Sequence, residues 1–260
     1  MVLPPDSSRR EPMGHFVDLH SHFLPGLDDG ARDLETALRM VQALAALGFG
    51  DLYATPHQRA GMFLPTRTDI DAAFHQVREQ AHELARTDGT ELKIGLGAEN
   101  FWDDVFHDRL RQGQQPSYDG GPAFLFEVNP QLMPPGIENE LFQMRVRGQL
   151  PVMAHPERYV AIQGEIAAAE RIGRSAALLV DLGALDGAHG RIEMKTARRL
   201  VLDGLVHAAA SDAHSPEDQG AIASGMAWIR KQRGAAVLEQ LLDENPRRIL
   251  SGELPEPPPA

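Results

Sequence analysis

The chain has 260 residues and contains no cysteine, which excludes a disulfide framework, thiolate metal sites and a cysteine nucleophile. Apolar residues make up 42% of the chain and charged residues 24%, as in a soluble globular protein rather than a disordered or fibrous one. The formal net charge is −12, so we expect no nucleic-acid partner, because an acidic surface repels a phosphate backbone.

Both ends of the chain are expected to be tails. Residues 1–14 carry prolines and arginines but no apolar run, and we predict that they are disordered. Residues 252–260 are rich in proline and are predicted to be extended and solvated. One domain is expected between them, at 15–251. No segment has the pattern of a membrane span or an export signal, so we expect a cytoplasmic protein without membrane insertion.

Short apolar runs alternate with longer amphipathic runs along this domain. The short runs are apolar throughout rather than alternating, as expected of parallel strands that are covered on both faces. Seven strands are predicted, at 16–19, 51–55, 92–97, 123–126, 150–154, 177–182 and 206–210.

Helices are predicted between these strands. Asp33 is suited to cap a helix that ends at Gly48. Further helices are predicted at 69–86, 139–147, 164–172, 191–203 and 235–243. Repeated strand–helix units favour a parallel α/β architecture, and periodicity leaves a barrel and a wound sheet as alternatives.

Histidines and carboxylates follow six of the seven predicted strands. In a parallel barrel the carboxyl ends of the strands converge on one mouth, where these side chains would meet. Asp28 lies beside Asp29 in the loop after the first strand. The side chains expected at the mouth are His20, His22, Asp29, His57, Glu99, Glu127, His155, Asp212 and His214.

Such a set of side chains calls for cations. Carboxylates crowded into one cavity would repel one another and take up protons unless positive charge compensates them. His20 and His22 are two residues apart on a strand and therefore point to the same face. Imidazole and carboxylate ligands without sulfur favour zinc, manganese or iron, and nine ligands suit two or three ions. The other histidines are interpreted as ordinary surface or core residues: His15, His75, His82, His107, His189 and His207.

The motifs resemble those of the polymerase and histidinol phosphatase (PHP) superfamily. Within it they are similar to the bacterial tyrosine-protein phosphatases of capsular and exopolysaccharide synthesis, over nearly the whole domain. The resemblance is carried by His20-Ser21-His22, Leu24-Pro25-Gly26-Leu27-Asp28-Asp29-Gly30, Ala54-Thr55-Pro56-His57, Ala154-His155-Pro156-Glu157-Arg158-Tyr159 and Ser211-Asp212-Ala213-His214.

The resemblance implies a distorted, seven-stranded (β/α) TIM-like barrel with three divalent ions, usually Mn²⁺, with iron or zinc as alternatives. It implies that the first ion is held by His20, His22, Glu99 and Asp212. The second ion would share Glu99 and add Glu127 and His155, and the third would take Asp29, His57 and His214.

The implied activity is metal-dependent hydrolysis of phosphotyrosine on a tyrosine autokinase that regulates polysaccharide synthesis. Arg158 would bind the substrate phosphate, and a water molecule beside Asp212 or His214 would supply the proton to the leaving oxygen. Glu157 is interpreted as a solvated loop charge. Assembly into a homo-oligomer stays open.

One residue departs from the family pattern. In the family a second arginine usually follows the Asp-Ala-His motif, but this chain has Gln219 near that place. A glutamine cannot supply the charged grip of a guanidinium, so Arg59 and Arg32 are the candidates to replace that arginine in phosphate binding. Three alternatives are therefore kept: a histidinol-phosphatase-like enzyme acting on small molecules, a proofreading-type nuclease, and a non-catalytic, metal-stabilised adaptor of the kinase.

Overall fold

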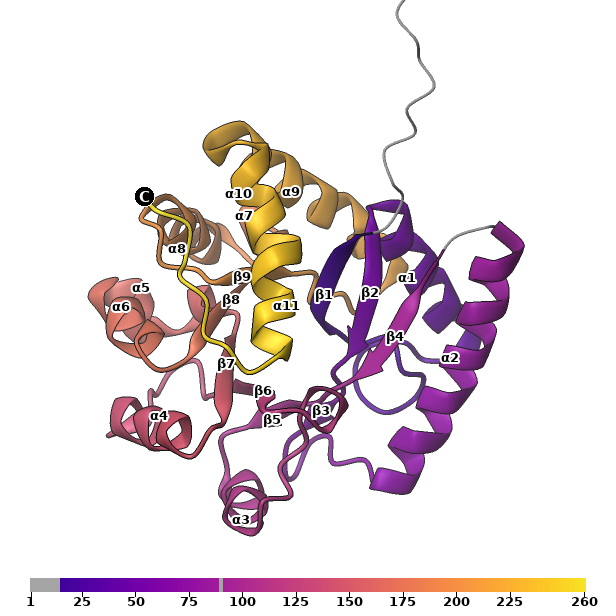
Figure 1. Ribbon diagram of the computed structural model, residues 1–260, viewed down its shortest axis with the longest axis horizontal. Coiled ribbons are helices and arrows are strands. Elements are labelled where there is room, and N and C mark those ends of the chain that lie inside the picture. The colour runs from indigo at the N-terminus through magenta and orange to yellow at the C-terminus, as the bar shows by residue number, and fades with distance from the viewer. Residues whose placement is uncertain (1–14, 89–90) are drawn as a thin grey trace, which may run out of the picture.

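The computed structural model describes residues 15–88 and 91–260, so the predicted tail at 1–14 lies outside the described residues. The described chain forms parallel strands surrounded by helices (Figure 1). One sheet has the order β1-β2-β4, and the other has the order β3-β5-β6-β7-β8-β9. The strands are β1 (Phe16–Ser21), β2 (Phe49–Ala54), β3 (His57–Gln58), β4 (Lys93–Leu96), β5 (Glu99–Phe101), β6 (Ala123–Glu127), β7 (Leu150–Ala154), β8 (Ala177–Asp181) and β9 (Ala208–Ala210).

All seven predicted strands are present and the named strands pair in parallel, which confirms the parallel α/β class. The strands divide between two sheets because the chain bends after β2 at Thr55-Pro56 and after β4 at Gly97-Ala98. Backbone hydrogen bonds continue through the bends, from the Gly97 N–H to the Ala54 carbonyl (2.8 Å) and from the Glu99 N–H to the Pro56 carbonyl (3.1 Å). A parallel bridge from Ser21 to Ala213 also joins the end of β1 to the segment after β9.

Most predicted helices are present with small shifts at their ends. Asp33 caps the first of them, since its Oδ1 accepts the Thr36 N–H at 2.8 Å. The helix predicted at 164–172 is found at Ala167–Gly173, and a separate short helix that was not predicted, Val160–Gly164, precedes it. The helix predicted at 235–243 continues into a π-helical turn, Gln240–Glu244. These helices are α1 (Leu34–Ala46), α2 (Arg67–Asp88), α4 (Ile137–Val146), α5 (Val160–Gly164), α6 (Ala167–Gly173), α8 (Arg191–Leu202) and α10 (Ala235–Glu239).

Further helices lie where the sequence pattern predicts none. They are α3 (Asp104–Gln112), α7 (Leu182–Asp186), α9 (Gln219–Arg233) and α11 (Asn245–Leu250), with 3-10 turns at Tyr118–Gly120, Pro156–Arg158 and Pro216–Asp218. Gly225 lies in the middle of α9, where glycine lowers helix propensity. A Cβ at Gly225 would lie 2.0 Å from the Leu182 carbonyl oxygen, so glycine lets α9 pack directly on α7.

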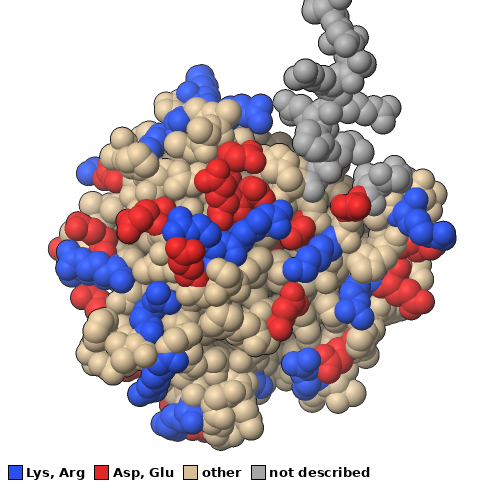
Figure 2. Space-filling model, viewed as in Figure 1, with Lys and Arg blue, Asp and Glu red and all other residues tan. Residues whose placement is uncertain are grey.

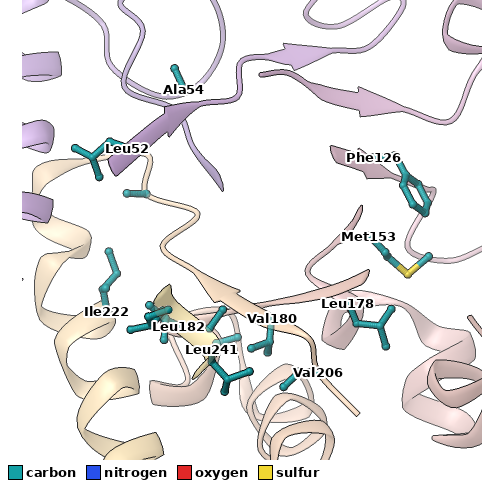
Figure 3. Close-up of a cluster of buried hydrophobic side chains, with 14 of the residues drawn as sticks. Leu52, Ala54, Phe126, Met153, Leu178, Val180, Leu182, Val206, Ile222 and Leu241 are labelled. Atoms are coloured by element: carbon teal, nitrogen blue, oxygen red, sulfur yellow. The ribbon is translucent and has the colours of Figure 1, made fainter. Parts of the chain in front are cut away.

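The strands bury apolar side chains on both faces. Leu178 and Val180 of β8 belong to the larger cluster, between the strands and the helices (Figure 3). Leu179, between them, points to the other face and joins a second buried cluster, as the alternation of a strand requires.

Helix α11 closes one end of that second cluster, and it lies in front of the strands in Figure 1. Its Ile249 is fully buried, which stabilises the fold by roughly 1.5–3 kcal/mol. It shares the cluster with the first residues of β6 to β9, which are Ala123, Leu150, Ala177 and Ala208. The amino-terminal ends of these strands are therefore sealed, and their carboxyl ends form the other mouth.

The C-terminal segment packs on the domain, so the prediction that it is solvated was wrong. Pro255 and Pro258 are buried, and the Asn245 side-chain amide donates to the Glu256 carbonyl at 3.2 Å. Arg233 also donates to the Pro259 carbonyl. Proline has no N–H that needs a partner, so an extended proline-rich segment can cover apolar surface at little cost.

The surface in view in Figure 2 carries basic side chains beside acidic ones. Ion pairs of this kind on the protein include Arg247 with Asp51 at 3.0 Å. Exposed pairs each contribute at most about 1 kcal/mol. Within residues 15–88 and 91–260, no helix has the length and apolarity needed to cross a bilayer.

We predict that His207 makes the fold sensitive to acid. Burial lowers the pKa of His207 to about 4, and its Nδ1 accepts the Leu178 N–H at 3.0 Å, so the folded protein holds the ring neutral. The stabilising contribution is complete above the unfolded pKa of about 6.5 and is lost as the pH falls from there towards 4. His207→Asn keeps an acceptor that does not titrate. Urea unfolding at pH 7 and pH 4.5 should show a loss of free energy that is about 2 kcal/mol smaller in the variant; equal losses would contradict the prediction.

Candidate metal centre

The nine predicted ligands meet at the carboxyl-end mouth. Glu99, at the start of β5, lies at the centre of the set and is buried. Its Oε2 is 3.3 Å from His20 Nε2 and 3.0 Å from His57 Nδ1, and its Oε1 accepts from His155 Nε2 at 2.8 Å. One carboxylate thus touches imidazoles from three separate parts of the chain.

The ligand atoms fall into overlapping groups, each narrow enough for one cation. The first contains His20, His22 and Asp212; the second contains His57, Glu99 and Glu127; the third contains His22, Asp29, His57 and His214. In each group the ligand atoms lie within 4.8 Å of one another. His22 and His57 belong to two groups each, so the division of ligands among three ions stays a prediction.

Unsatisfied polar atoms at this mouth fit a cation. His57 Nδ1, Glu127 Oε1 and Asp212 Oδ1 are buried and make no well-oriented hydrogen bond with the described residues, although His57 Nδ1 lies close to Glu99 Oε2. A buried polar atom without a partner costs free energy, which a coordinated cation would recover. All three atoms belong to predicted ligands, and nitrogen and oxygen donors are those that first-row divalent metals accept.

The pKa values of the groups at the mouth also favour a bound cation there. Burial alone would raise the pKa of Glu99 and of Asp212, but the neighbouring histidines hold both well below their usual range, with Arg158 acting also on Asp212. Burial would lower the pKa of His57, yet Glu99, Asp29 and Glu127 raise it well above its usual value. The carboxylates therefore draw protons onto the imidazoles when no other cation is present. Metal ions would take the place of those protons, because a histidine ligand must be neutral.

Two buried aspartates orient the first ligands. Asp28 accepts from His22 Nδ1 at 2.9 Å and from the His57 N–H at 3.0 Å, which leaves Nε2 of His22 facing the other ligands. Asp18 accepts from the Ser211 hydroxyl at 2.5 Å and so fixes the residue before Asp212. Burial raises the pKa of Asp18 to about 6.

Two of the predicted ligands have an unusual backbone conformation. His155 has φ 34° and Asp212 has φ 47°, in the left-handed region that a side chain other than glycine seldom adopts. Each follows a buried strand, β7 and β9, and the turn directs the side chain across the mouth. Strain of about 1–3 kcal/mol per residue is tolerated where the site requires the geometry.

Arg158 lies beside the ligand set. Its Nη2 donates to Asp212 Oδ2 at 2.5 Å and to Asp181 Oδ2 at 2.9 Å, and 26% of its side chain is exposed. Of the three predicted catalytic residues, Arg158 and Asp212 are in direct contact, and His214 Nδ1 is 3.8 Å from Asp212 Oδ1.

The sequence analysis missed part of the surroundings of Arg158. Asp181 ends β8 and is buried, and His189 Nε2 lies 2.5 Å from its Oδ2. His189 is an exposed residue, as interpreted, but its contact with Asp181 was not predicted. Glu157 is fully buried rather than solvated, and its Oε1 accepts the Asp181 N–H at 3.3 Å. Burial, with Asp181 nearby, raises the pKa of Glu157 well above its usual range. A lone charge inside the apolar run at 177–182 was the available signal for Asp181.

Gln219 turns away from the ligands. Its side-chain amide donates to the Ala43 carbonyl of α1 at 3.1 Å. Arg32 is mostly exposed and pairs with Asp33 at 3.1 Å. Arg59 is half-buried two residues after His57, and its guanidinium lies 4.1 Å from the centre of the Phe101 ring.

Comparison with known proteins decides the family. The family model for capsular polysaccharide synthesis proteins, CpsB/CapC, matches residues 16–251. The chain belongs to the CpsB/CapC family. The tyrosine-protein phosphatase CpsB of Streptococcus pneumoniae is 28% identical over 252 residues, covering 92% of this chain and 99% of CpsB. The tyrosine-protein phosphatase YwqE of Bacillus subtilis is 26% identical over 239 residues, covering 91% of this chain and 92% of YwqE.

Solved structures agree with this assignment. A crystal structure from a study of B. subtilis YwqE and S. pneumoniae CpsB, described as unique metal-dependent tyrosine phosphatases, superposes with a TM-score of 0.78 at 26% identity. It covers 94% of this CpsB/CapC chain and 100% of the solved chain. An organophosphorus hydrolase mutant from Deinococcus radiodurans superposes with a TM-score of 0.55 at 14% identity, covering 90% of this chain and 92% of the hydrolase, and shows a shared fold.

We predict that Gly30→Ala disrupts the loop that carries Asp28 and Asp29. A Cβ at Gly30 would lie 2.0 Å from the His22 carbonyl oxygen, so the loop must move away from His22. The free energy of unfolding should fall by about 1–3 kcal/mol, and the metal content should fall with it. Gly164→Ala is the control, because a Cβ there meets open space. Full metal content in the Gly30→Ala protein would contradict this role for the loop.

Proposed function

We propose that this protein is a metal-dependent phosphomonoesterase that hydrolyses phosphotyrosine on protein substrates. The observation that carries the proposal is the convergence of imidazoles, carboxylates and one arginine at a single mouth. The relatives CpsB and YwqE, which are named tyrosine-protein phosphatases, align with nearly the whole chain and support it.

The proposed metal ligands are the nine predicted at the outset. The first ion would be held by His20, His22, Glu99 and Asp212; the second by Glu99, Glu127 and His155; and the third by Asp29, His57 and His214. We propose Mn²⁺ as the metal, with iron or zinc as alternatives that the same ligands accept. Bound divalent ions would lower the pKa of water and offset charge on the phosphoryl oxygens.

The chain's own residues bind the phosphate and guide the proton. Arg158 would donate to the phosphoryl oxygens and stabilise the charge on them in the transition state. In the proposed reaction the bond from a water oxygen to phosphorus forms while the bond from phosphorus to the tyrosine oxygen breaks. Asp212 and His214, whose Oδ1 and Nδ1 are 3.8 Å apart, would hold the water molecule that returns a proton to that oxygen.

The biological setting follows from the family. We propose a cytoplasmic enzyme whose substrate is a tyrosine autokinase that regulates capsular or exopolysaccharide synthesis. We also propose that the two sheets are the wall of a distorted seven-stranded barrel, because backbone hydrogen bonds continue through the bends at Pro56 and Gly97. The domain would span 15–251, which is close to the family match.

The position of Gln219 supports a second candidate function. Gln219 faces α1, so Arg158 has no partner arginine at the predicted place, and a small phosphate ester would need fewer contacts than a phosphoprotein. A histidinol-phosphatase-like enzyme is therefore the alternative, and a non-catalytic adaptor of the kinase is the other.

Activity of the purified protein tests these candidates. We expect hydrolysis of a phosphotyrosine peptide, loss of activity with a chelator and recovery with Mn²⁺. Arg158→Ala should lower kcat/KM by about a hundredfold at unchanged metal content, because one charged donor to the phosphoryl group is removed. Faster hydrolysis of histidinol phosphate would favour the small-molecule enzyme. Kinase binding without turnover would favour the adaptor, and full activity after chelation would refute the metal mechanism.

A further inference from the structure

Two polar side chains that are not among the nine predicted ligands also contact Arg158, next to the ligand Asp212. Asp181 is buried at the end of β8, with 2% of its side chain exposed, whereas His189 lies between α7 and α8 with 36% exposed. Both converge on Arg158. The Oδ2 of Asp181 accepts from Arg158 Nη2 at 2.9 Å, and His189 Nε2 is 3.2 Å from the same Nη2.

Each contact of Asp181 is directional. Its Oδ1 accepts the Gly183 N–H at 2.7 Å, which fixes the carboxylate relative to the first turn of α7. Its Oδ2 receives two donors, Arg158 Nη2 and His189 Nε2 at 2.5 Å. Both oxygens of the carboxylate therefore have partners that fix its orientation, and it contacts the guanidinium from the end of a buried strand.

Arg158 keeps a free donor in this arrangement. All its hydrogen bonds described above use Nη2, and Nε is buried without an acceptor in the described part of the chain. A buried donor without a partner indicates that the site is completed by an acceptor from outside the chain, as a phosphoryl oxygen would be.

We propose that Asp181 and His189 are positioning residues for Arg158, which they hold in the orientation that receives the substrate phosphate. This inference rests on the proposed phosphatase function. Asp181 supplies the fixed acceptor, and His189 occupies the outer side of Asp181 Oδ2 and keeps Arg158 from swinging into solvent. An arginine with a long flexible stem gains affinity for phosphate when its orientation is set in advance.

A double-mutant cycle tests the proposal. Asp181→Ala and His189→Ala should each raise KM for p-nitrophenyl phosphate about tenfold and change kcat by less than about threefold, since orientation is lost while the metal ligands stay. Asp181→Asn keeps an oxygen acceptor and should recover most of the loss. In an Arg158→Ala background the same substitutions should not raise KM further, because the residue that Asp181 and His189 position is absent.

Controls separate this role from a structural one and from the proposed function. His107→Ala removes a similarly exposed histidine, with 30% of its side chain exposed, that lies on α3 and pairs with Glu140, and it should leave KM unchanged. Inorganic phosphate is the second probe, and its Kd should rise about tenfold in Asp181→Ala. Adding Asp181→Ala to the Arg158→Ala protein should leave the Kd for phosphate unchanged. A further rise in KM or Kd when Asp181→Ala is added to Arg158→Ala would overturn the positioning role. An Asp181→Asn protein whose KM is as high as that of Asp181→Ala would overturn it as well. An unmodified protein that binds phosphate through Arg158 but has no turnover would instead overturn the proposed function.

Discussion

The main physical constraint on this structure is the repulsion among buried carboxylates at the carboxyl-end mouth, which positive charge must compensate. Glu99, Glu127 and Asp212 are buried at this mouth, and Asp29, with 54% of its side chain exposed, lies beside them. Like charges at such distances in a poorly solvated site cannot all persist without compensation. Imidazoles and Arg158 supply part of that compensation, and the buried oxygens and nitrogen that lack well-oriented hydrogen bonds indicate that more is needed. Divalent cations provide positive charge and coordination at the same atoms.

The rest of the fold holds these groups together. Parallel strands deliver their carboxyl ends to the same mouth, while α11 seals the opposite end with Ile249. Strain at His155 and Asp212 is stored where two strands end, and the glycine at position 30 lets a loop pass against the His22 backbone. Arg158 is held by two buried aspartates, Asp212 and Asp181, which both accept from its Nη2. Stability is thus concentrated in the apolar clusters, and the mouth holds the strained and charged groups.

The sequence was most informative where local pattern and function coincide. Six of the seven predicted strands are followed at once by a histidine or carboxylate, so both the seven strands and the ligand cluster could be predicted. Asp181 was missed because it lies inside an apolar run, where periodicity does not register a single charge. His189 meets Arg158 from 31 residues away, and only tertiary structure creates that contact. Helix α9 was missed because Gly220 and Gly225 weaken its pattern, and its stability comes from packing against α7.

Elemental analysis of the protein, purified without chelators, tests the central claim most directly. A cluster built to compensate buried carboxylates should retain first-row divalent ions, with up to three per chain, as the resemblance to the PHP phosphatases implies. Glu99→Gln, which removes the carboxylate shared by several ligands, should retain markedly fewer. An unmodified protein that is folded, free of such ions and unable to bind added Mn²⁺ would contradict the account.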